Sequence, residues 1–91
     1  MTKRTVPRPF SLPEGNGLVT EEVSTKERNR EPAIQLLEFD DGTSSLRFCF
    51  YADAKYQRTP LILKEEELAK LAKEIKKNPP ILTMLLKLVG K

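Results

Sequence analysis

The sequence predicts an α+β domain with an antiparallel sheet of three or four strands and a two-helix C-terminal unit on one face of that sheet. Strand-type alternation surrounds Asp41-Gly42 in the middle of the chain, and helix-type spacing of leucines follows Pro60. Strands followed by helices along one chain are typical of α+β proteins. The length of 91 residues fits one small domain.

Residues 33–51 are predicted to form a β-hairpin. Asp41-Gly42 lies between two apolar runs, and this dipeptide favours a two-residue type I′ turn because both central residues need positive φ. Such a turn places Leu37 opposite Leu46, and it fixes the rest of the register. The next cross-strand pairs are then Gln35 with Phe48 and Ala33 with Phe50. One face is expected to carry Phe39, Leu46, Phe48 and Phe50. The other is expected to carry Ile34, Leu36, Glu38, Arg47, Cys49 and Tyr51.

A helix is predicted over residues 65–77. Its buried stripe follows the i, i+3, i+4, i+7 spacing and consists of Leu68, Leu71, Ala72 and Ile75. Glutamates in the first turn and lysines in the last match the helix dipole. We expect Leu68, Leu71 and Ile75 to cover the apolar face of the hairpin.

A second helix is predicted over residues 81–89, after Asn78-Pro79-Pro80 ends the first. Its sequence ILTMLLKLV is apolar on nearly all sides, so one sheet face cannot cover it. We therefore expect a homo-oligomer, most simply a homodimer, with contacts through Ile81, Leu85 and Leu88.

Residues 1–16 are expected to be a flexible basic N-terminal arm, because three prolines interrupt them, and residues 17–91 the folded domain. Two interpretations of the arm stay open. It is an inert tail, or it closes over a phosphate backbone or a neighbouring subunit.

The composition excludes several classes of protein. One cysteine and no histidine allow neither an intramolecular disulfide nor a Cys/His zinc site, and they remove every histidine-containing catalytic triad. We expect no metal, no cofactor and no catalysis. The sequence has no apolar segment near Met1 and no run of 18 or more apolar residues, so we expect neither a signal peptide nor a membrane span, and we expect a cytoplasmic location. The richness in Lys and Glu resembles that of proteins from thermophiles.

The candidate binding residues combine two aromatic rings and three cations: Arg47, Tyr51, Lys55, Tyr56 and Arg58. Cations follow phosphates and aromatic rings stack on bases when single-stranded nucleic acid is bound. The alternative interpretation is structural, with Tyr51 packed against a helix and the cations as ordinary surface charge. The formal net charge of +3 permits nucleic-acid binding without requiring it.

The order of hairpin, basic aromatic connector, proline and leucine-bearing helix resembles the single-stranded-DNA-binding domain of the transcriptional-coactivator/whirly type. The residues that carry this resemblance are Arg47, Phe48, Phe50, Tyr51, Pro60, Leu61, Leu63, Leu68, Leu71 and Ile75. The Gly- and Lys-rich turn that this type of domain has before its helix is absent here. In general plan and composition the chain is also similar to the ThermoDBP-related single-stranded-DNA-binding proteins. Both resemblances imply the same ligand.

The sequence therefore favours a non-catalytic protein that binds single-stranded nucleic acid, DNA or RNA, through a basic and aromatic surface on an oligomeric domain. The alternative is a protein-interaction or oligomerisation module that binds no nucleic acid.

Overall fold

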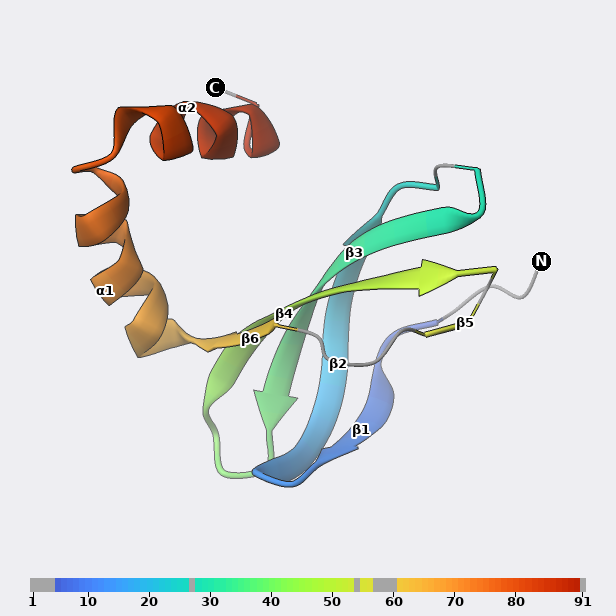
Figure 1. Cartoon of the computed structure of the whole chain (residues 1–91). Helices are drawn as coiled ribbons and strands as arrows, with labels where there is room; N and C mark the ends of the chain where they lie inside the picture. Colours follow the sequence, from blue (N-terminus) through green and yellow to red (C-terminus); the bar gives the residue numbers. More distant parts are fainter. Residues whose placement is uncertain (1–4, 27, 54, 57–60, 91) are drawn as a thin grey trace.

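The computed structural model describes residues 5–26, 28–53, 55–56 and 61–90 (Figure 1). It is an α+β fold with an antiparallel sheet followed by two C-terminal helices, as predicted, and the sheet is curled. The strands are β1 (Arg8–Leu12), β2 (Gly15–Ser24), β3 (Arg30–Phe39), β4 (Ser44–Ala52), β5 (Lys55–Tyr56) and β6 (Leu61–Lys64). The helices are α1 (Glu65–Ile75) and α2 (Pro79–Leu88). The sheet has six strands within the described ranges, so the predicted number of three or four was too low.

The strands follow one another in the order β1-β2-β3-β4-β5, and β6 pairs with β4 beside β5. The first strand lies inside the segment predicted to be a flexible arm. That prediction was wrong for residues 8–16, because Arg8–Leu12 pairs with β2 and residues 15–16 begin β2 itself. Pro9 is compatible with β1 because an edge strand can leave one backbone donor unused.

The turn between β3 and β4 has three residues, Asp40 to Gly42, rather than two. The amide of Gly42 donates to the carbonyl of Phe39 over 2.9 Å, and the amide of Phe39 donates to the carbonyl of Thr43 over 2.9 Å. Gly42 has a φ of 89°, as the last residue of such a turn requires. The carboxylate of Asp41 accepts hydrogen bonds from the amide and the hydroxyl of Thr43, which lower the pKa of Asp41 and hold the turn.

The longer turn shifts the register by one residue, so the predicted register was wrong. Gln35 lies opposite Arg47, where Phe48 was expected, and Leu46 lies opposite Leu36. A shift of one residue exchanges the faces of one strand relative to its partner. Phe39 and Arg47 therefore share a face, whereas Phe48 lies on the other face with Ile34.

The face that we call the inner face holds all of the buried side chains described in the structure. Its apolar members are Val19, Ala33, Leu37 and Tyr51, and its polar members are Gln35, Ser45 and Arg47. The sheet curls toward this face, since a side chain of β1 reaches one of β4 although the two strands are not paired. The predicted burial of Phe48 and Phe50 was wrong, because both are half-buried on the opposite, outer face.

The helices leave the end of β6 as an arm and do not lie over the sheet (Figure 1). Neither α1 nor α2 contains a buried residue, so the predicted layer of Leu68, Leu71 and Ile75 over the hairpin is not formed. The second helix begins at Pro79, where the side chain of Asn78 accepts a hydrogen bond from the amide of Ile81. In the described part of the chain no helix has the length and apolar character needed to cross a membrane.

Candidate functional site

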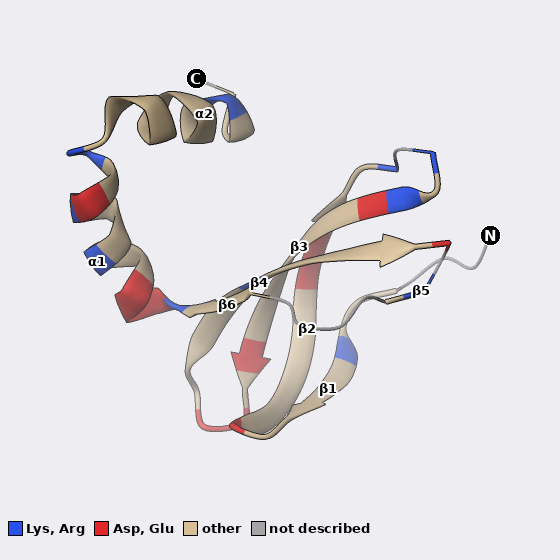
Figure 2. Cartoon of the chain, viewed as in Figure 1, with Lys and Arg blue, Asp and Glu red and all other residues tan. Residues whose placement is uncertain are grey.

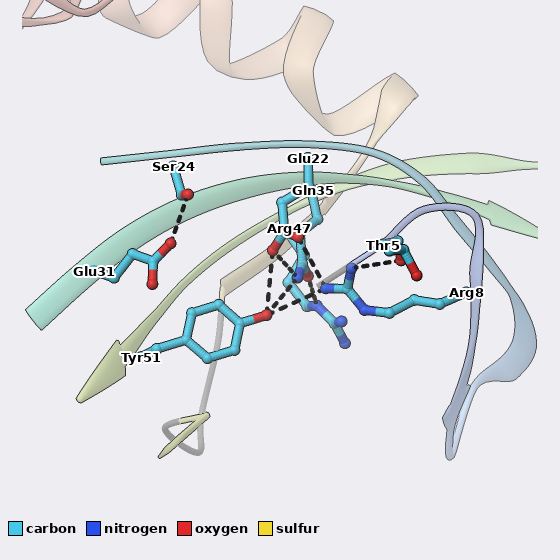
Figure 3. A network of polar contacts seen from close by, with 8 residues as sticks. All are labelled: Thr5, Arg8, Glu22, Ser24, Glu31, Gln35, Arg47 and Tyr51. Carbon is cyan, nitrogen blue, oxygen red and sulfur yellow. Dashed lines mark hydrogen bonds and ion pairs between the residues drawn. The ribbon is translucent and has the colours of Figure 1, made fainter. Parts of the chain in front are cut away.

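Polar side chains from four strands, β1 to β4, meet on the inner face of the sheet (Figure 3). Glu22 of β2 is the centre of this cluster. Its carboxylate accepts hydrogen bonds from Gln35 Nε2 over 2.8 Å and from the hydroxyl of Tyr51 over 3.2 Å, and it forms an ion pair with Arg8 over 3.0 Å. Arg8 also donates to the hydroxyl of Tyr51 over 3.2 Å. The cluster therefore connects the first strand to the middle of the sheet.

Glu22 is ionised in this environment. Burial by itself would raise its pKa, but the hydrogen bond from Gln35 and the hydrogen bond and positive charge of Arg8, together with the hydroxyl of Tyr51, lower the pKa below the usual 4.5. The negative charge of Glu22 is thus balanced by the hydrogen bonds that it accepts and by the ion pair with Arg8. The positive charge of Arg8 is in turn neutralised by Glu22.

Arg47 is the second cation of the inner face, and its position differs from that of Arg8. Its Nε donates to Gln35 Oε1, the cross-strand neighbour. Its guanidinium carbon lies 5.3 Å from the ring centroid of Tyr56 and 6.0 Å from that of Phe10. Both distances are in the range of cation–π contacts. The guanidinium of Arg47 therefore lies near one ring from β1 and one ring from β5, the first and last strands in the order of the sheet.

The terminal nitrogens of Arg47 have no hydrogen-bond acceptor among the residues that the structure describes. Only 8% of this residue is exposed. A guanidinium has five N–H donors, and burying a charged group with most of its donors unused is costly. An oxygen-bearing ligand on the inner face would supply the missing acceptors.

Tyr56 forms the accessible rim of this cluster, with 40% of its surface exposed. Its ring packs edge to face against that of Tyr51 with centroids 5.5 Å apart. Partial burial raises the pKa of its phenol above 10.0, although the charge of Arg47 acts in the opposite direction. The ring is therefore neutral at physiological pH and partly exposed to solvent.

Three of the five predicted site residues lie together: Arg47, Tyr51 and Tyr56. Tyr51 is 6% exposed, so its ring supports that of Tyr56 and is not itself available for stacking. Lys55 is exposed, but it lies opposite Ala52 and thus on the outer-face side of β5. Arg58 lies outside the described residues.

Sequence reasoning missed four members of the cluster: Arg8, Phe10, Glu22 and Gln35. Gln35 carried a detectable signal, because it is the one polar residue in the apolar run AIQLL. Arg8 and Phe10 gave no local signal, since only the pairing of β1 with β2 brings them near β4.

Charge is unevenly distributed over the two ends of the sheet (Figure 2). The end with the β2–β3 and β4–β5 turns carries the cations Lys26, Arg28, Arg30 and Lys55, beside Glu31 and Asp53. The end with the β1–β2 and β3–β4 turns carries the anions Glu14, Glu38, Asp40 and Asp41. Tyr56 lies in β5 at the cationic end, so this end is the favourable side for an anionic ligand.

No group of three or more potential metal ligands occurs in the described residues. Comparison of the chain with protein-family models, with curated proteins and with solved structures found no match.

Proposed function

We propose that this protein binds single-stranded nucleic acid at the inner face of its sheet, without catalysing a reaction on it. The observation that carries the proposal is the environment of Arg47. Its buried guanidinium lies between the rings of Phe10 and Tyr56, and its terminal donors have no acceptor in the described part of the chain.

A nucleotide offers the groups that this arrangement lacks. Phosphate oxygens and base carbonyls accept hydrogen bonds from a guanidinium, and a base has a flat face that can stack on an exposed ring. In the proposed complex a base stacks on Tyr56 and an oxygen of the same or the next nucleotide accepts from Arg47. Tyr51 positions the ring of Tyr56, with which it packs edge to face.

The distribution of charge over the sheet suggests the path of the bound nucleic acid. The phosphate backbone would leave the inner face past the cationic end, near Lys26 and Arg28, and would avoid the four carboxylates at the other end. A single strand fits this path better than a duplex, because stacking on Tyr56 requires an unpaired base.

Fluorescence anisotropy with a labelled oligothymidylate, the matching oligouridylate and a duplex tests the proposal. We expect both single strands to bind more tightly than the duplex. The affinity should fall as salt is added, and the logarithm of the binding constant should decrease with the logarithm of the salt concentration by a slope of roughly 0.7 per phosphate contact. Tyr56→Ala should weaken binding with little change in that slope, since stacking releases no counterions. Tyr56→Phe should bind like the wild type.

The matched comparison for charge is Arg47→Gln against Lys73→Gln, which removes the same charge from the exposed surface of α1. Arg47→Gln should weaken binding at least tenfold and Lys73→Gln should not, with thermal melting to confirm that both variants are folded. If no single strand binds at low salt, or if Tyr56→Ala binds like the wild type, the proposal is wrong. The alternative of a protein-interaction module would then remain.

A further inference from the structure

The arm formed by α1 and α2 exposes more apolar surface than a stable isolated unit should. None of its residues is buried. Its large exposed apolar residues are Leu71, Ile81, Met84, Leu85, Leu86 and Leu88. Val89 follows the last helix and is exposed as well. Contiguous apolar surface of this kind marks an interaction site.

The outer face of the sheet is also apolar and uncovered. Its large apolar side chains come from four strands and are Leu18, Val23, Ile34, Leu36, Leu46, Phe48, Phe50, Leu61 and Leu63. Not one of them is buried. An antiparallel sheet that has one solvated face normally alternates apolar and polar residues, with the polar ones outward. Here the polar cluster lies on the inner face and the apolar residues point outward.

These two surfaces do not cover each other within one chain. Glu65 begins α1 directly after Lys64 ends β6, and the amide of Lys64 donates to the carboxylate of Glu67 over 2.8 Å. The start of α1 is thereby fixed to the edge of the sheet. Among the described elements α1 contacts β4, β6 and α2, whereas α2 contacts α1 and no strand.

Charge does not oppose contact between the two surfaces. The arm carries five lysines and four glutamates over residues 65–90, a net charge of +1. The outer face carries Glu21 and Glu38 together with Arg30 and Lys55, so its charges balance. Burial of apolar surface is therefore the driving force for their association.

We infer that two copies of this chain form a symmetric dimer in which the arm of each copy lies on the outer face of the other. Each chain supplies one apolar arm and one apolar face, so a second copy covers both surfaces at once and the assembly closes with two-fold symmetry. An 11-residue helix is ~16 Å long and a 10-residue strand is ~33 Å long, so each helix of the arm fits within the length of the face.

Light scattering after size-exclusion chromatography tests the inference on the full chain without nucleic acid. The wild type should have twice the mass of the 10.4 kDa chain at micromolar concentration. Leu85→Asp changes the arm and Phe48→Asp changes the outer face, and each variant should be largely monomeric. Asn29→Asp adds the same charge in the β2–β3 turn, outside both surfaces, and should remain dimeric.

A mixture of the two variants separates this arrangement from contact between two arms. Leu85→Asp retains an intact face and Phe48→Asp an intact arm, so the mixture should recover heterodimers with one working contact. If two arms contact each other instead, Phe48→Asp stays dimeric when alone.

A crosslink gives a second measurement that does not depend on destabilising changes. In a Cys49→Ser background, oxidation of a Met84→Cys chain mixed with a differently tagged Leu36→Cys chain should give the mixed disulfide. A wild-type mass of one chain at tens of micromolar, or crosslinks only between two Met84→Cys chains, would overturn the inference. Binding at Tyr56 is measured separately, so each proposal can fail alone.

Discussion

Gln35 and Arg47 lie directly opposite each other in β3 and β4, and the Oε1 atom of Gln35 accepts a hydrogen bond from Nε of Arg47. Gln35 has no exposed surface. Its Nε2 donates to the carboxylate of Glu22 and to the hydroxyl of Tyr51. One amide thus joins the second, third and fourth strands on the inner face. A slip of one residue would move Arg47 away from this partner, so the pair specifies the register as well as the site.

Gln35→Leu should lower the free energy of unfolding by about 1–3 kcal/mol, because it removes the acceptor of the buried Nε–H of Arg47 and one of the hydrogen bonds that the carboxylate of Glu22 accepts. Urea denaturation measures the change. The double variant Gln35→Leu/Arg47→Met should lose less than the sum of the two single variants, since it removes both members of the pair. Strictly additive losses would show that the two side chains are not coupled.

Stability should depend on pH through Glu22. Its folded-state pKa is lower than the ordinary 4.5, so ionised Glu22 stabilises the fold above that pH, and the contribution is lost as the pH falls through 4.5 toward the lower, folded-state value. Glu22→Gln should therefore have a lower melting temperature than the wild type at pH 7. The two should converge in acid.

Glu21→Gln is the matched control for this comparison, because Glu21 is exposed on the same strand. It should follow the wild-type pH profile. A Glu22→Gln melting curve parallel to that of the wild type at all pH values would contradict the assignment.

The elements whose signals are local could be predicted from the sequence, and the pairings that depend on distant residues could not. The periodic leucines of residues 65–75 and the apolar runs beside Asp41-Gly42 identify a helix and a hairpin. The register required a choice between a two-residue and a three-residue turn, and the Asp-Gly dipeptide is compatible with both. The hydrogen bonds that the carboxylate of Asp41 accepts from the amide and the hydroxyl of Thr43 favour the longer turn.

Only the part of the candidate site that is formed by residues close in sequence could be predicted. Tyr51 and Tyr56 are close in sequence and pack together across the turn between β4 and β5. Arg8 is 43 residues from Tyr51, and it comes from a proline-bearing segment that has no strand signal of its own. Only the curl of the complete sheet brings it to the inner face.

Gly17→Ala should destabilise the protein by about 1–3 kcal/mol, because the added methyl group overpacks a closed site. Gly17 pairs with Phe10 of β1 and Phe39 of β3, whose rings pack edge to face with centroids 5.0 Å apart. A Cβ atom at Gly17 would clash with the carbonyl oxygen of Glu38 and would lie 2.7 Å from the Cα of Phe39. Backbone atoms cannot move aside as a flexible side chain can.

Gly42→Asn is the control for loss of a glycine. No atom lies within 4 Å of a Cβ at Gly42, and asparagine tolerates the positive φ of this turn. Its melting temperature should stay close to that of the wild type. Equal losses in the two variants would mean that conformational freedom, rather than packing at Gly17, determines the effect.

The ionisation of Tyr56 should report its contact with Arg47. The chain has two tyrosines, so Tyr51→Phe leaves Tyr56 as the single source of tyrosinate absorbance. Partial burial raises the pKa of Tyr56 above 10.0 and the charge of Arg47 opposes that rise. Removing this charge with Arg47→Gln should therefore raise the pKa of Tyr56 further. Lys73→Gln, which removes a charge from α1, should leave the titration unchanged. A pKa that stays constant or falls in Arg47→Gln would place the guanidinium away from the ring, and the proposed binding site would lose its central pair.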